Sequence, residues 1–131
     1  MKRILVAALA AFTLVGAIPA TAQQAPFAGG GGMADAKDPA VDKLEAEALK
    51  LDKQLKAKPK DAALKTKAAE AWYKTGHASM TSGALSPRVK YRGALKCYRR
   101  ALELNPKHKE AAADKTMIED IYKQMGRPVP Q

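Results

Sequence analysis

The 131-residue sequence predicts an all-α protein, a short antiparallel array of about four helices. Three observations lead to this prediction. After residue 38, apolar side chains recur three or four residues apart over long stretches, as they do on one face of a helix. Capping residues, prolines and glycines bound these stretches. No stretch alternates convincingly between apolar and polar residues, as a half-buried strand would.

The first two helices follow each other closely. Asp38 and Pro39 are typical of a helix start, with a capping side chain before a first-turn proline. This first helix should end before Pro59. Its apolar face consists of Val41, Leu44, Ala48, Leu51 and Leu55. The second helix is expected from about Asp61 to about Met80. Its buried face is expected to contain Leu64, Ala68, Ala71, Trp72, Thr75 and Ser79.

The third and fourth helices have similar boundary signals. Ser86 and Pro87 predict the start of the third helix, which should end near Leu104. Its expected buried face is Tyr91, Ala94, Leu95, Tyr98, Ala101 and Leu102. The fourth helix is expected from about Lys109 until Gly126, which stands where a left-handed C-terminal cap is needed. Its apolar residues are Ala113, Met117, Ile118, Ile121 and Tyr122.

The N-terminal segment predicts export. Residues 1–22 combine a short basic start, an apolar run over residues 4–18 and small residues before a cut expected after Ala22. The run is shorter than the roughly 20 residues that span a bilayer, so no stable membrane anchor is expected after cleavage. Residues 23–38 include four consecutive glycines and are expected to form a disordered tether. Residues 39–127 form the predicted helical domain, in the periplasm or secreted.

Two segments of the domain carry a repeat-like pattern. Residues 69–78 read AEAWYKTGHA, and residues 93–106 read GALKCYRRALELNP. In the second segment two alanines let neighbouring helices approach, a tyrosine fills the gap between them, and a proline stops the helix. The positions that carry the pattern are Trp72, Gly76, Ala94, Tyr98, Ala101 and Pro106. They resemble one tetratricopeptide repeat (TPR), flanked by two partial repeats, over about residues 41–126.

The chain departs from the TPR pattern in two ways. Six extra residues are inserted around residues 81–87. Thr75 and Ser79 stand where the family usually has leucine and an aromatic residue, and both are expected to weaken the packing. Because repeat arrays generally need about three units to be stable alone, the sequence predicts marginal stability or self-association as a homodimer.

The resemblance also implies a partner-binding groove. In the family, the first helix of each repeat lines a concave groove that takes up peptides. The matching groove positions are Glu70, Tyr73, His77 and Met80, with Glu110, Ala113, Met117 and Asp120 in the following half-repeat. Packing against a neighbouring helix would equally explain Tyr73 and Met80.

Positive charge is concentrated in the third helix. Residues 86–109 contain eight Lys and Arg but a single acidic residue, whereas the whole chain has 23 Lys and Arg against 13 Asp and Glu. With 100° between successive residues, five of these side chains share the arc opposite Tyr98. This predicted basic stripe consists of Arg88, Arg92, Lys96, Arg99 and Arg100. It is either an ordinary solvated face or a surface that binds an anion.

Residues for catalysis or for a cofactor are not evident. The two histidines lack partners at metal-ligand spacing, and the glycines of residues 29–32 are not part of a phosphate-binding motif. Cys97 is the lone cysteine, so it cannot form an internal disulfide and is expected as a small apolar residue at a helix contact. We expect no enzyme activity, no metal and no cofactor.

The function expected from these observations is that of an exported TPR-like adaptor that binds a protein partner in the cell envelope. One alternative is an anion-binding module that uses the basic stripe to bind an envelope polymer, an acidic protein or a lipid headgroup. Another is a structural oligomeriser. Nucleic acid is not an expected ligand, because the chain carries an export signal and no aromatic residues alternate with its charges.

Overall fold

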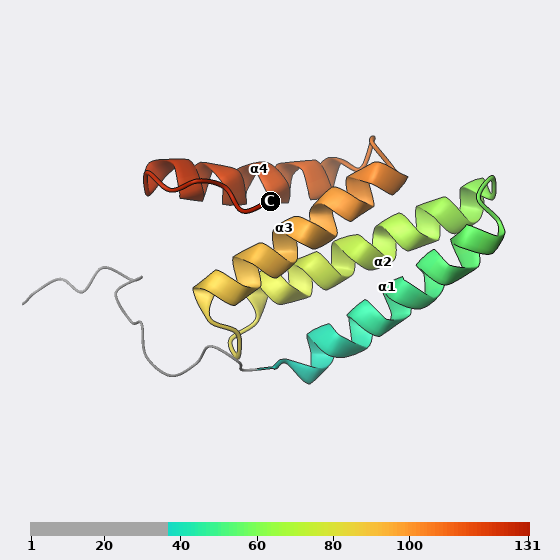
Figure 1. Cartoon of the computed structure of the whole chain (residues 1–131), viewed down its shortest axis with the longest axis horizontal. Helices are drawn as coiled ribbons and strands as arrows, with labels where there is room; N and C mark the ends of the chain where they lie inside the picture. Colours follow the sequence, from blue (N-terminus) through green and yellow to red (C-terminus); the bar gives the residue numbers. More distant parts are fainter. Residues whose placement is uncertain (1–36) are drawn as a thin grey trace, which may run out of the picture.

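The computed structural model describes residues 37–131, which form four helices and the loops between them (Figure 1). The helices are α1 (Pro39–Ala57), α2 (Ala62–Thr81), α3 (Pro87–Leu104) and α4 (Lys109–Gln124). No strand occurs in this range, and none of its helices is long and apolar enough to cross a membrane. The predicted all-α class is therefore confirmed. The predicted signal peptide and most of the predicted tether lie outside the described residues.

The helix ends follow the predicted signals, with one difference. The carboxylate of Asp38 accepts a hydrogen bond from the N–H of Ala40 at 2.9 Å, and that of Asp61 accepts one from Leu64 at 2.9 Å. Both therefore satisfy N–H groups that a helix start leaves free. Ser86 precedes α3 as expected, but its side chain makes no capping hydrogen bond. Thus Pro87, whose φ is fixed by its ring, is the local start signal there.

Each helix packs mainly against the next helix along the chain. Helix α2 lies between α1 and α3. Helix α4 packs on α3 and has only a small contact with α2. Figure 1 shows α1 and α2 side by side, with α4 beyond α3 on the side away from α1. Helix α4 therefore lies on the far side of α3 from α1, and only part of it reaches α2.

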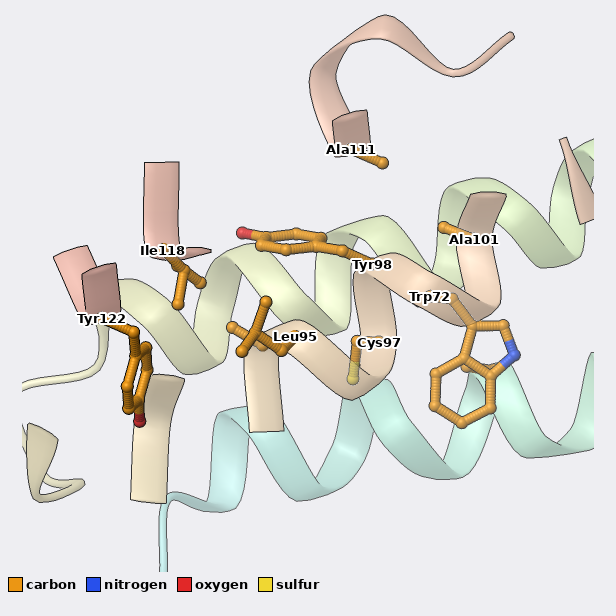
Figure 2. Packing of buried hydrophobic residues seen from close by; sticks show 10 residues of the cluster. Trp72, Leu95, Cys97, Tyr98, Ala101, Ala111, Ile118 and Tyr122 are labelled. Carbon is orange, nitrogen blue, oxygen red and sulfur yellow. The ribbon is translucent and has the colours of Figure 1, made fainter. Parts of the chain in front are cut away.

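Helices α2 and α3 approach closely where Gly76 faces Tyr98. A Cβ atom added to Gly76 would lie 2.7 Å from Cε1 of Tyr98, closer than real Cβ atoms come. Tyr98 is fully buried at the centre of the core, as Figure 2 shows. The core consists of Ala48, Trp72, Ala94, Leu95, Cys97, Tyr98, Ala101, Ala111, Ile118 and Tyr122. The expected burial of Trp72, Ala94 and Tyr98 is confirmed.

Thr75 and Ser79 are the two residues that the repeat pattern predicts to weaken the packing. Both are buried, and their hydroxyl groups donate hydrogen bonds to the carbonyl oxygens of Ala71 (2.8 Å) and Lys90 (3.1 Å). A Cβ atom on Gly93 would lie 2.9 Å from the Oγ of Ser79, so even this small side chain fills the space before α3. At this contact a large aromatic side chain would force the two helices apart.

The loop between α2 and α3 fixes the start of α1. The hydroxyl of Ser82, which is buried, donates a hydrogen bond to the carboxylate of Asp38 at 2.6 Å. The same oxygen accepts hydrogen bonds from the N–H groups of Ala84 and Leu85 at 3.1 and 3.2 Å. The residues inserted relative to the TPR pattern therefore tie α1 to the α2–α3 pair.

The Asp38–Ser82 contact predicts a dependence of stability on pH. The hydrogen bond from Ser82, followed by that from Ala40, lowers the pKa of Asp38 below its ordinary value of 3.8. A lowered pKa in the folded state contributes stability above the unfolded value, and this stability is lost as the pH falls through the folded value. We expect the difference in unfolding free energy between the wild type and Asp38→Asn to shrink from pH 6 to pH 2.5. A difference that stays constant in urea titrations would contradict this assignment.

Trp72 offers a test of the core. It is 4% exposed, and among residues 37–131 its Nε1–H has no hydrogen-bond partner. Trp72→Ala should cost about 3–5 kcal/mol of unfolding free energy, because it opens a large cavity. Trp72→Phe should cost much less, because it keeps a ring and removes a buried donor whose desolvation costs about 1–3 kcal/mol. Urea unfolding followed by circular dichroism measures both variants, and equal losses would be inconsistent with an unsatisfied donor.

Candidate functional site

Side chains of α2 and α4, most of them polar or aromatic, contact one another around the hydroxyl group of Tyr98. We call this group the α2–α4 site. Its members are Glu70, Tyr73, His77 and Met80 on α2, Tyr98 on α3, Glu110 and Asp114 on α4, and His108 at the start of α4. Five of the eight groove positions implied by the repeat resemblance belong to this site, namely Glu70, Tyr73, His77, Met80 and Glu110. The other three, Ala113, Met117 and Asp120, are exposed on α4, and Met117 is 45% exposed.

Asp114 links three helices. One of its carboxylate oxygens, Oδ2, accepts a hydrogen bond from the hydroxyl of Tyr98 at 3.1 Å and lies 3.4 Å from Nδ1 of His77. Burial, followed by the charge of Asp114, raises the pKa of Tyr98. The tyrosine is therefore a donor that stays protonated, and it holds the carboxylate of α4 against α2 and α3.

Tyr73 occupies the centre of the site. The centroid of its ring lies 4.8 Å from that of His108, 5.9 Å from that of His77 and 6.0 Å from that of Tyr98. Burial raises the pKa of Tyr73, and so do three nearby carboxylates. In order of effect these are Asp114, Glu110 and Glu70. Three carboxylates therefore lie near this ring, although the whole chain carries a net charge of +10.

His108 caps α4 and faces two carboxylates. Its Nδ1 accepts a hydrogen bond from the N–H of Ala111 at 3.4 Å, which is the capping role of a helix-start residue. Its Nε2 lies 3.3 Å from Glu70, and Nδ1 lies 3.2 Å from Glu110. In the neutral form with a proton on Nε2, the ring satisfies both Ala111 and Glu70.

A cavity of about 300 Å³ opens beside His108. Glu70 and Thr66 of α2 line one side, and the α3–α4 loop with Glu110 lines the other. Lys107 and Lys109 stand at the same cavity, and Lys74 lies 3.5 Å from Glu70. The cavity is therefore a recess at the His108 end of the α2–α4 site, and two carboxylates and two lysines line it.

The predicted basic stripe is divided between two surfaces. Arg100 turns toward α1, where its Nε and Nη2 donate to the two oxygens of Asp52 at 3.1 and 3.2 Å. Its Nη1 donates to Glu103 at 2.8 Å, and Lys96 lies 4.0 Å from Glu45 of α1. These ion pairs compensate the charge of Arg100 within the chain, so this residue does not act as a free cation on an outward face.

The other end of the stripe faces the C-terminal tail. Arg88 and Arg92 line a second cavity, which Arg127 of the tail also lines. Arg99 is partly buried and lies outside that lining. Arg88 and Arg92 therefore share a surface with Arg127, and Arg100 lies on a different surface.

Sequence reasoning alone missed several members of these groups. Asp114 shares a helical face with Glu110, four residues before it, so the period of α4 could have indicated it. The hydroxyl of Tyr98 was a second signal, because a buried tyrosine needs a hydrogen-bond partner. The partners of His77 and His108 lie 37 and 38 residues away, and Arg127 follows the last helix, so no spacing revealed them.

Comparison with known protein families, with curated protein sequences and with solved structures found no match for this chain.

The Tyr98–Asp114 hydrogen bond can be measured with a double-mutant cycle. Asp114→Ala leaves the buried hydroxyl with only Sδ of Met80, 3.8 Å away, and should cost about 1–3 kcal/mol of unfolding free energy. In the background of Tyr98→Phe the same substitution should cost clearly less, because the unsatisfied donor is absent. Denaturant titration of the four proteins gives the coupling energy, and strictly additive costs would refute the role assigned to Asp114.

Proposed function

We propose that this chain is an exported, non-enzymatic adaptor with a TPR-like architecture, which binds a protein partner in the cell envelope through the α2–α4 site. The observation that carries the proposal is the position of Tyr73, whose ring lies among two histidines and within the field of three carboxylates. The signal-like order of residues 1–22 supports export. The resemblance of residues 69–106 supports the repeat architecture.

The charge of the site selects the kind of partner. Glu70, Glu110 and Asp114 place three carboxylates near the ring of Tyr73 within a basic protein. A segment with Lys or Arg fits there, because its cationic head can pair with the carboxylates. Its aliphatic stem can lie over the ring of Tyr73, where a cation is also attracted by the ring face. The partner segment is therefore cationic, and the net positive charge of the chain disfavours basic partners that cannot reach the recess.

A binding role suits the reactive groups that are present. Cys97 is buried, and burial is the main cause that raises the pKa of its thiol to about 12. The thiolate is the nucleophilic form, so this cysteine is unsuited to covalent catalysis or to disulfide exchange at neutral pH. The residues of the α2–α4 site are carboxylates, imidazoles, phenols and one thioether that contact one another through hydrogen bonds, ion pairs and ring contacts, an arrangement that can recognise a cation without any reaction.

Anion binding is the second candidate function, because Arg88 and Arg92 line a cavity together with a third arginine. A structural homodimer remains a further prediction from the small number of repeats. In residues 37–131 the exposed large hydrophobic side chains are Leu49 on α1 and Met117 on α4. Sedimentation over a range of concentrations tests the dimer, and a monomer at every concentration would eliminate it.

The adaptor proposal predicts selective binding of cationic peptides. On an array of paired peptides, the full-length chain should bind those with Lys and Arg and not their counterparts with Glu at the same positions. The double substitution Glu70→Gln with Glu110→Gln should weaken this binding at least about fivefold, near 1 kcal/mol. Tyr73→Ala should weaken it further, because the aromatic platform is lost.

The matched control is the double substitution Asp42→Asn with Glu47→Gln, which removes two exposed carboxylates of α1 without touching the site. It should leave the affinity unchanged. A loss equal to that of the Glu70 and Glu110 double variant would mean that the net charge alone governs binding. Preference for the Glu-bearing peptides would refute the proposal.

A further inference from the structure

A cavity of about 480 Å³ lies between the first turns of α3, the end of α4 and the C-terminal tail. It is separate from the α2–α4 site, since the two share no lining residue. Three arginines, Arg88, Arg92 and Arg127, line it together with Tyr91 and Tyr122. We call this cavity the arginine pocket. Its volume falls within the range of roughly 300–1,000 Å³ typical of small-molecule sites.

A specific backbone turn brings Arg127 to this pocket. Gly126 has a φ of 63°, its N–H donates to the carbonyl of Lys123 at 2.9 Å, and the N–H of Arg127 donates to that of Tyr122 at 3.0 Å. This pair of hydrogen bonds is the Schellman motif that ends a helix and reverses the chain. Val129 packs against the hydrophobic core, so the tail is fixed where it folds back from α4 (Figure 1).

The three arginines that line the pocket are exposed and have no carboxylate partner in the part of the chain that the structure describes. Among residues 37–131, none of Arg88, Arg92 and Arg127 has a carboxylate oxygen within 4.0 Å, and no Asp or Glu lines the pocket. Arg100, which lies on α3 with Arg88 and Arg92, by contrast has two carboxylate partners. Uncompensated cations around one cavity repel one another, and a bound anion relieves that repulsion.

The other residues that line the pocket are largely apolar. Tyr91, Tyr122 and Met125 give apolar surface beside the charges, and prolines of α3 and of the tail extend it. Guanidinium groups bind phosphate and carboxylate in bidentate geometry. We propose that the arginine pocket binds a small organic anion, with a phosphate or dicarboxylate head attached to a ring or a short apolar chain.

Phenyl phosphate is a probe with both features, and calorimetric titration of the full-length chain measures its binding. We expect saturable binding of phenyl phosphate and of phthalate, weaker binding of inorganic phosphate, and none of benzyl alcohol, which has the ring without the charge. Arg92→Gln and Arg127→Gln should each weaken phenyl phosphate binding at least about fivefold. Arg99→Gln, which removes a positive charge of α3 outside the pocket, should change it less than about twofold.

A second pair of variants tests the geometry without changing any charge. Gly126→Ala strains the left-handed turn and should weaken binding, whereas Gly126→Asn should retain most of it, because asparagine tolerates that conformation. Circular dichroism confirms that each variant is folded.

Three results would overturn the proposal. The first is that neither phenyl phosphate nor phthalate binds, and the second is that Arg99→Gln costs as much as Arg92→Gln. The third is that Arg92-dependent binding is found only to vesicles of phosphatidylcholine with phosphatidylglycerol, which would identify a membrane surface as the ligand.

Discussion

The contact between Gly76 and the ring of Tyr98 is the constraint on which the rest of the structure depends. It allows α2 and α3 to lie close enough for a short array without disulfides to enclose a core, because Gly76 has no side chain and the ring of Tyr98 packs directly on the backbone of α2. The buried ring also directs its hydroxyl toward Asp114. One residue thus fixes the distance between α2 and α3 and sets the position of α4.

The core and the α2–α4 site are therefore one structural system. Tyr98 belongs to both, and Tyr73 reaches it from α2 with its ring 6.0 Å away. A partner that binds the carboxylate of Asp114 competes with the hydrogen bond that holds α4, so binding and helix packing are energetically coupled. By contrast, backbone hydrogen bonds of the Schellman turn after α4 position Arg127 at the arginine pocket. None of these hydrogen bonds involves a residue of the α2–α4 site.

Local signals explain why the fold could be predicted from the sequence. Asp38 and Asp61 cap their helices, and Gly126 has the expected positive φ, because such features depend only on neighbouring residues. The small residues of α3 likewise indicated its buried face. The pairings across helices could not be predicted, because they depend on crossing angles and on register. Arg100 shows this clearly, since a helical wheel places it outward while α1 supplies Asp52 to bind it.

The α2–α4 site and the arginine pocket lie toward opposite ends of α4. Helix α4 has 16 residues and is therefore about 24 Å long, with Asp114 in its first half and Arg127 beyond its end. From Asp114 to the last turn the helix axis measures about 15 Å, which exceeds the Debye length of about 8 Å at physiological ionic strength. Exposed charges at one end are therefore largely screened from the other, so a charge brought to one of the two places leaves the electrostatics of the other nearly unchanged.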